Sequence, residues 1–438
     1  MTRAPLPLLL AAAAVLLLAG CVSPQTADRN GADSTAAASP ARSETTGPSL
    51  APQRAPVRTV QLYRGDDERA LPVVSMNGSG TLTLEFDLLR AQGRPLSVYF
   101  VHADRTWRRD LSPNRVLESY HNDQLLDYRS SSGTQVPYVH YRYDFPNDDI
   151  RFRVSGNYIL RVTERGRRDS VLFERPFFVT DEAGQLQLGA EAIAVPGQRQ
   201  ASLRPVARFQ PPSSLQGDPF GYAACFVRNG RLRHARCQDR PLLVRQPELS
   251  FELERQRAFA PTTADYALDI GDLRTGPSIE RTDRSASPYR ILLEPDYAQF
   301  SGQSLLDADL NGQIVVRDAV RGRADPALTA EYVETTFAFV PPNERPLTGG
   351  LVVAGSFSGM DPARGIPMEW VPGRARYEGS MLLKQGRYQY FYSGEDARLE
   401  TALRRSQARR QSTYTAFLYY RDPSEGTDRL LRVGAFRR

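Results

Sequence analysis

Residues 98–162 decide the fold; they read VYFVHADRTWRRDLSPNRVLESYHNDQLLDYRSSSGTQVPYVHYRYDFPNDDIRFRVSGNYILRV. The first segment, residues 98–103, alternates its side chains so that one face can be buried while the other stays semi-polar. A second segment, residues 138–145, has aromatic residues at every other position and ends at Pro146, which cannot donate to a strand ladder. A third, residues 158–163, follows a Ser-Gly-Asn turn. The stretch therefore predicts β-sheet.

Strands of this kind continue on both sides of the stretch. Short segments with mostly alternating polarity, separated by Gly, Pro, Asn and Asp, are typical of a β-sandwich. We expect one N-terminal β-sandwich over residues 57–182. Its predicted strands are residues 57–63, 81–88, 98–103, 138–145, 158–163 and 171–180.

The motifs of this region resemble the N-terminal module of the type IX secretion system plug protein family. They are LSP (111–113), LESY (117–120), FPN (145–147) and SGNYIL (155–160), and further matches follow at VRNGR (227–231), DLNG (309–312), LKQGRY (383–388) and YYR (419–421). Together they extend the resemblance over roughly residues 57–438. One departure is Ala103, which stands where the family usually has a cysteine.

The resemblance implies a non-enzymatic role in protein secretion. Members of the family bind the periplasmic mouth of the large outer-membrane β-barrel translocon of the type IX system and seal it. The implied partner is therefore that translocon, and the implied location is the periplasmic side of the outer membrane.

The first 21 residues are typical of a bacterial lipoprotein signal. Arg3 is followed by an apolar run over residues 6–18 and by Leu-Ala-Gly before Cys21. The run is too short for a bilayer-spanning helix, which needs about 20 apolar residues. We expect Cys21 to be lipidated and to anchor the chain in the membrane. An ordinary secretory signal, cleaved nearby, is the alternative.

Residues 22–56 are rich in Ser, Thr, Ala, Gly and Pro and have no hydrophobic period. Such a segment cannot bury enough apolar surface to offset its ordering entropy. It is predicted to be a disordered tether.

The charge of the chain gives little indication of a charged ligand. The formal net charge is +6 and the pI about 9.2, but acidic residues are interleaved with the basic ones. This pattern favours a solvated surface over an anion-binding patch and gives no support for nucleic acid as a partner. Hydrophobic residues make up 41% of the chain, which is enough for several cores.

The rest of the chain continues in the same way. A middle β-domain over residues 183–345 and a C-terminal module over residues 346–438 complete an all-β protein of tandem immunoglobulin-like or early-set β-sandwiches. The middle domain should contain strands near residues 249–253, 266–270 and 332–340, and no long amphipathic helix is evident.

The C-terminal module resembles the early-set sandwich of starch- and glycogen-binding proteins. In such a module Trp370 and Phe357 could stack on sugar rings, and Lys384 could supply a polar contact. The alternative is that the aromatic side chains fill the core and that Lys384 lies in a hairpin turn. The second reading is favoured because Met360 stands where such binders often have tryptophan.

Cys225 and Cys237 flank Asn229-Gly230, a strong two-residue hairpin signal. In that hairpin Cys225 opposes His234, and Cys237 points to the other face of the sheet. A disulfide would need a bulge or a different turn, so the sequence leaves the state of these two cysteines open.

Metal binding has one candidate. Residues 307–318 match the D-x-D-x-N-G pattern of a calcium loop, but Asp318 replaces the usual glutamate and no helix flanks the loop. A hairpin turn at Asn311-Gly312 explains the same residues. The four histidines have no metal-ligand spacing, so no metal site is predicted.

Catalysis has no candidate either. The segment Gly355-Ser-Phe-Ser-Gly359 has phenylalanine where a nucleophile elbow has serine. We therefore expect a protein that is not an enzyme and has no cofactor or small-molecule substrate. A glycan-binding lipoprotein is the competing hypothesis, and a hydrolase built from dispersed carboxylates is a weaker third.

Overall fold

The computed structural model describes residues 47–438 except 119, 197–200, 216–217, 246, 261–264, 299–309, 323–324 and 406–411. Most of these residues lie in β-strands, and the described helices are short. The prediction of an all-β chain is therefore confirmed.

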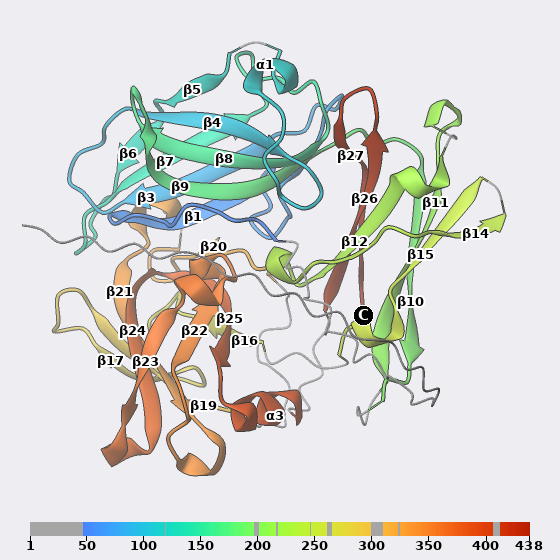
Figure 1. The fold of residues 1–438 in the computed structure, drawn as a ribbon. Helices are drawn as coiled ribbons and strands as arrows, with labels where there is room; N and C mark the ends of the chain where they lie inside the picture. Colours follow the sequence, from blue (N-terminus) through green and yellow to red (C-terminus); the bar gives the residue numbers. More distant parts are fainter. Residues whose placement is uncertain are drawn as a thin grey trace, which may run out of the picture. The chain divides into compact units, whose positions relative to one another are not determined.

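The N-terminal domain is a sandwich of two sheets around one core (Figure 1). One sheet has the order β1-β3-β7-β6 and the other the order β2-β9-β8-β4-β5. The strands are β1 (Val57–Arg64), β2 (Val73–Ser75), β3 (Leu82–Leu88), β4 (Leu96–Ala103), β5 (Asn122–Leu125), β6 (Tyr128–Ser130), β7 (Val139–Phe145), β8 (Gly156–Glu164) and β9 (Arg167–Thr180), and α1 (Pro113–Val116) lies between β4 and β5.

Strand β3 is buried along its whole length. Its leucine and phenylalanine side chains belong to the core of the sandwich. Thr83, Glu85 and Asp87 alternate with them and so point to the opposite face, yet they are also buried. Buried polar groups need hydrogen-bond partners, and on this face other parts of the chain supply them.

The predicted tether ends earlier than expected. Residues 47–56 are described and are attached to the folded body: the backbone N–H of Ala51 donates to Glu174 at 2.7 Å, and Arg364 donates to the carbonyl of Leu50 at 2.6 Å. Glu174 is fully buried and also accepts from Arg161 at 2.8 Å. This buried carboxylate gives the segment an ordered partner, which its own composition could not reveal.

The central domain is a second sandwich, built from two four-stranded sheets. The sheet orders are β10-β11-β15-β14 and β13-β12-β26-β27. The strands are β10 (Gln185–Ile193), β11 (Ser202–Gln210), β12 (Tyr222–Arg228), β13 (Arg236–Gln238), β14 (Leu242–Arg245), β15 (Glu248–Glu252), β26 (Thr413–Asp422) and β27 (Thr427–Arg437).

The C-terminal module contains a ten-stranded sheet. Eight of its strands follow the order β16-β25-β22-β23-β24-β21-β18-β17, and the other two are β19, which pairs with β21, and β20, which pairs with β25. Its strands are β16 (Tyr266–Asp269), β17 (Ile279–Asp283), β18 (Arg290–Leu293), β19 (Asp296–Tyr297), β20 (Val315–Val316), β21 (Tyr332–Val340), β22 (Leu351–Gly355), β23 (Ile366–Val371), β24 (Arg376–Lys384) and β25 (Gly386–Gly394).

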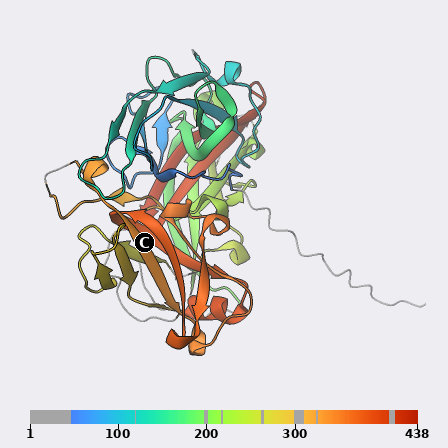
Figure 2. The same ribbon diagram turned by 90° about the vertical axis from the view of Figure 1, so that its left-hand side faces the viewer.

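Strand pairing crosses the predicted boundary at residues 345 and 346 in both directions. Strands β16 to β21 precede the boundary but pair within the C-terminal module, whereas the last hairpin, β26–β27, pairs with β12. In Figure 1 and Figure 2 this hairpin, drawn in red, lies beside strands drawn in green. Such exchanges depend on long-range register, which a local pattern does not encode.

The remaining regular structure is short. The α-helices after α1 are α2 (Pro326–Thr329) and α3 (Ala397–Arg405). The 3-10 helices are η1 (Ser213–Leu215), η2 (Pro219–Gly221), η3 (Leu232–His234), η4 (Arg255–Arg257), η5 (Pro342–Glu344), η6 (Ser356–Ser358), η7 (Pro362–Arg364) and η8 (Pro372–Arg374). No helix in the described part of the chain combines the length and apolar character that crossing a bilayer requires.

An apolar junction joins the N-terminal sandwich to the central one. It brings β4, β8 and β9 against β12, β26 and β27 through one cluster of buried side chains. Phe178 and Phe417 lie at its centre with ring centroids 4.4 Å apart, and Trp107 packs on Phe178 at 5.5 Å. We call this cluster the apolar junction.

The hairpin at Asn229-Gly230 differs from the two-residue form that the sequence favoured. The turn continues into η3, and Cys225 then faces Cys237 directly across β12 and β13. The two cysteines form a disulfide. Because the turn is longer than two residues, β13 pairs with β12 in a different register. The predicted pairing of Cys225 with His234 is therefore wrong.

Candidate functional site

Lys384, the one lysine of the chain, is buried at the end of β24. Its Nζ donates to Asp87 Oδ2 at 2.7 Å and to the backbone carbonyl of Ala327 at 2.7 Å. The ammonium also lies 4.2 Å from the ring centroid of Tyr138, within range of a cation–π contact. Lys384 is 1% exposed and its ammonium is directed at groups of the protein, whereas the predicted polar contact to a glycan would need it at the surface.

Asp87 is the centre of this cluster. Besides Lys384 it accepts the hydroxyl of Tyr332 at 2.7 Å and Nδ1 of His140 at 2.9 Å. Asp87 and His140 belong to β3 and β7 of the N-terminal sandwich, whereas Tyr332 and Lys384 belong to β21 and β24 of the C-terminal module. These four residues form what we call the ionic junction, because they join the two domains.

The protonation states in the ionic junction follow from its geometry. Burial raises the pKa of Asp87, but the charge of Lys384 and the hydrogen bond from His140 outweigh it and hold that pKa below its ordinary value. Burial lowers the pKa of His140, but its hydrogen bond to Asp87 and the proximity of Glu85 raise it above its ordinary value. Burial lowers the pKa of Lys384, and Asp87 offsets only part of that effect.

Glu85 extends the ionic junction toward the surface. It accepts the hydroxyl of Tyr63 at 2.9 Å and pairs with Arg142 at 3.1 Å, while Nε2 of His140 lies 3.7 Å away. Burial raises the pKa of Glu85, but its contacts with His140 and Tyr63 lower it overall. His140 is thus held between two carboxylates, as expected for an imidazolium.

The acid, base and amine groups of the ionic junction are buried. Asp87 is 0% exposed and Lys384 is 1% exposed. Each charged atom of this pair is occupied by another group of the protein, so no solute can reach it. What the arrangement can do is hold the N-terminal sandwich against the C-terminal module, because a paired buried charge is costly to separate.

The ionic junction was not predicted from the sequence, although strand β3 contains a signal for it. Glu85 and Asp87 stand at alternate positions of an otherwise apolar strand, LTLEFDL. Charged residues there indicate a second buried face, but their partner Lys384 lies 297 positions away. Lys384 could be identified as this partner only from the assembled sheets.

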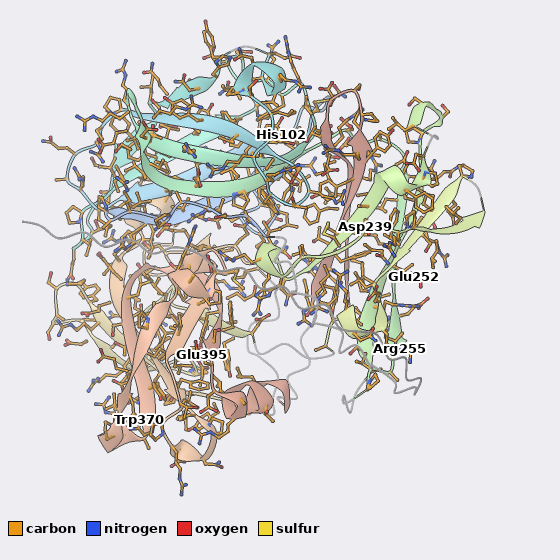
Figure 3. The ribbon with its side chains drawn as sticks, in the orientation of Figure 1. His102, Asp239, Glu252, Arg255, Trp370 and Glu395 are labelled. Carbon is orange, nitrogen blue, oxygen red and sulfur yellow. A yellow bond between two sulfur atoms is a disulfide. The ribbon has the colours of Figure 1, made fainter. Side chains whose placement is uncertain are left out.

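The three predicted glycan-binding residues do not converge. Trp370 is half-buried near the tip of the β23–β24 hairpin and packs on Tyr377, with ring centroids 5.2 Å apart (Figure 3). Phe357, in η6, packs on Phe337 at 5.6 Å. Lys384 is occupied by the ionic junction. Both aromatic side chains serve partly as core, and they do not share one surface with the lysine.

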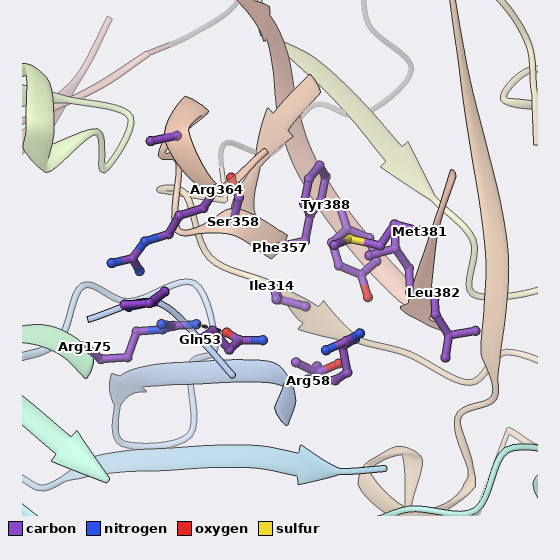
Figure 4. A pocket seen from close by; sticks show the side chains of 14 residues that line it. Gln53, Arg58, Arg175, Ile314, Phe357, Ser358, Arg364, Met381, Leu382 and Tyr388 are labelled. Carbon is purple, nitrogen blue, oxygen red and sulfur yellow. Dashed lines mark hydrogen bonds between the residues drawn. The ribbon is translucent and has the colours of Figure 1, made fainter. Parts of the chain in front are cut away.

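Phe357 lines a cavity of about 280 Å³ (Figure 4). Residues from the N-terminal sandwich, from the segment just before it and from the C-terminal module form its wall. Neither Trp370 nor Lys384 belongs to that lining. In this cavity apolar and cationic side chains meet around an accessible space.

The other predicted sites have simple structural outcomes. Asn311 and Gly312 form a turn with φ angles of 51° and 74°, and Asp318 caps a turn by accepting the N–H groups of Val320 and Arg321 at 3.0 Å. Residues 307–309 of the proposed calcium loop, and Cys21, lie outside the described residues. Among the residues that are described, no group of three His, Cys, Asp or Glu side chains is placed to hold a metal ion.

Comparisons with known proteins agree with this architecture. Residues 57–181 match the family model described as type 9 secretion system plug protein 1st domain, which confirms the predicted resemblance over that range. The crystal structure of a hypothetical protein from Parabacteroides merdae is similar with a TM-score of 0.77 and 22% identity, covering 89% of this chain and 99% of that chain. This likeness shows the fold alone.

A mutant of Salmonella alpha-2-macroglobulin aligns with a TM-score of 0.18 and 10% identity, covering 88% of this chain and 23% of that chain, and carries no argument. No curated protein matches this chain.

Proposed function

We propose a function from one premise: residues 57–181 are a type 9 secretion system plug protein domain, so the chain takes part in type IX secretion. In that role it is a non-enzymatic component of the cell envelope. It binds the periplasmic end of the outer-membrane translocon barrel and seals it while no substrate is crossing. The family match carries this proposal.

The physical requirements of a seal support the proposal. A body that closes a wide pore must keep its shape when the partner pushes on it. Here the apolar junction fixes the N-terminal sandwich to the central one, and the ionic junction fixes it to the C-terminal module. Packed contacts between domains restrict hinge motion more than linkers alone do.

The lipid anchor belongs to the same proposal. A lipid on Cys21 would keep the released protein near its barrel, because tethering raises the effective concentration of one partner around the other. Residues 47–56 belong to the folded body, so the segment available as a tether is shorter than residues 22–56.

The first test is a pull-down. A tagged full-length chain is recovered from detergent-solubilised outer membranes, and co-purifying proteins are identified by mass spectrometry. We expect one large β-barrel in near-stoichiometric amount. A Cys21→Ser variant added to the same membranes is the matched control: it lacks the anchor and should still recover the barrel if binding is a property of the folded body.

Gene deletion tests sealing separately from binding. We expect the outer membrane to become permeable to large solutes when the protein is absent, and complementation to restore the barrier. Recovery of no barrel together with unchanged permeability would remove the proposal. Retention of the protein on α-glucan resin in that case would favour the glycan-binding alternative.

A further inference from the structure

The cavity shown in Figure 4 has two chemically different walls. One wall is apolar and comes from Phe357, Met381 and Ile314. The other contains Arg175 on β9 and Arg364 on η7, and a third arginine, Arg58 on β1, lies beside the apolar wall. In Figure 4 the side chains of Arg175 and Arg364 lie close to each other on one side of the cavity, and Arg58 lies below Ile314.

Two of these arginines are not neutralised by the protein. Arg58 donates through Nη1 to its neighbour's carbonyl at Val57, and its buried Nε has no partner. Arg175 donates to the side-chain oxygen of Gln53 at 2.8 Å and to a backbone carbonyl. Within the described part of the chain, neither has a carboxylate within ion-pair distance, whereas Arg364 lies 3.6 Å from Asp361.

The electrostatics of this wall favour an anion. Burial lowers the pKa of Arg175 to about 9, and the nearby charge of Arg364 contributes to that shift. Burial likewise lowers the pKa of Arg364. Both guanidinium groups are therefore held in an environment that penalises their charge. An anion between them would offset both the desolvation and the mutual repulsion.

We propose that this cavity binds a carboxylate attached to an apolar group, with the arginines holding the carboxylate and the apolar wall holding its substituent. Guanidinium groups match a carboxylate by paired N–H donors. A volume of about 280 Å³ holds one ring or one branched side chain with its carboxylate, and is too small for the two acyl chains of a phospholipid. The C-terminus of an extended peptide and a small organic acid both present this chemistry.

The proposal does not depend on the role in secretion, so its failure would leave that role untouched. The purified full-length chain is titrated by calorimetry with the acetylated tripeptide Gly-Gly-Phe as the free acid and as the C-terminal amide. Two further probes are 3-phenylpropionate and inorganic phosphate. We expect the free acid to bind at least about tenfold more tightly than the amide, because a hydrogen bond to a charged group contributes more than one to a neutral group.

Variants assign the binding to this cavity. Arg58→Gln and Arg175→Gln should each weaken binding of the free acid about tenfold or more, since each removes charge-assisted donors. Arg54→Gln is the matched control: Arg54 is exposed, lies four positions from Arg58 and does not line the cavity, so binding should be unchanged. Thermal melting checks that the variants fold, and a salt titration of the wild-type chain should weaken binding as screening increases.

The outcomes are distinct. If the peptide acid binds and 3-phenylpropionate does not, the proposal is supported and the ligand is a chain terminus. If both acids bind equally tightly, the proposal is supported and the ligand is a small organic acid. Equal binding of acid and amide, phosphate bound as tightly as either acid, wild-type affinity in Arg58→Gln, or no binding of any probe would each overturn it.

Discussion

The ammonium of Lys384 lies 2.7 Å from the carboxylate of Asp87, although the two residues are 297 positions apart and both are almost completely buried. The pair therefore joins the N-terminal sandwich to the C-terminal module through a contact from which solvent is excluded. Its consequences for stability can be measured directly.

Replacing Lys384 by methionine should destabilise the protein by about 3–5 kcal/mol, because the carboxylate of Asp87 is then buried without its counter-charge. The double variant Asp87→Asn/Lys384→Met should recover part of this loss, since neither partner then carries an unpaired charge. Denaturant unfolding followed by fluorescence measures both.

The control for this cycle is the exposed pair Arg290–Glu334, whose partners lie 2.8 Å apart. Arg290→Met should change stability by less than about 1 kcal/mol, as is usual for exposed ion pairs. A loss this small in Lys384→Met would contradict the structural role assigned to the ionic junction.

His140 gives the ionic junction a pH dependence of known sign. Its pKa is raised in the folded protein from its ordinary value of 6.5, since its contacts with Asp87 and Glu85 outweigh burial. The stability it contributes is therefore complete below about pH 6.5 and is lost as the pH rises through the folded-state pKa. Thermal melting of His140→Gln and of the wild-type chain, compared across pH 5 to 9, should give a difference that shrinks as the pH rises.

His121 provides the matched control because it is exposed and has no part in the ionic junction. His121→Gln should follow the wild-type pH profile. Asp87 acts in the opposite pH range: its folded pKa is lowered, so its contribution is lost as the pH falls through that value. A stability difference for His140→Gln that grows with rising pH would show that the imidazole is buried neutral.

The predictable part of this protein is local. Six strands of the N-terminal sandwich follow from alternation along the chain, and their predicted and observed bounds differ by a few residues at the ends. The short strands β2, β5 and β6 were not predicted. The ionic junction was not predictable, because Asp87 and Lys384 meet only when two domains pack. The arginines of the cavity were not predictable for the same reason, because Arg58 on β1 and Arg175 on β9 come together only in the folded chain.

The disulfide is an intermediate case. The sequence contained both cysteines and the turn between them, but the choice between a two-residue hairpin and the turn containing Leu232–His234 decided whether they face each other. That choice shifts the register of β13 and so turns Cys237 to the face of its partner.

The Cys225–Cys237 disulfide should stabilise the β12–β13 hairpin. Its loop spans 12 positions, for which the chain-entropy model gives roughly 3 kcal/mol. We expect reductant to lower the melting temperature of the wild-type chain and to have no effect on a Cys225→Ala/Cys237→Ala variant. Mass spectrometry after thiol alkylation checks the bond independently: labelled Cys225 and Cys237 in protein isolated from the cell envelope without reductant would contradict it.

The apolar junction gives the last prediction. Phe178 is 1% exposed and its ring lies 4.4 Å from that of Phe417, so Phe178→Ala leaves a cavity between the two sandwiches. The expected loss is about 3–5 kcal/mol in the free energy of unfolding. Phe220→Ala is the matched control, since Phe220 is 65% exposed and its loss should change stability by less than about 0.5 kcal/mol. Because Phe178 belongs to β9 and Phe417 to β26, hydrogen exchange should also increase in both strands of Phe178→Ala. Faster exchange confined to β9 would mean that the central sandwich folds without the apolar junction.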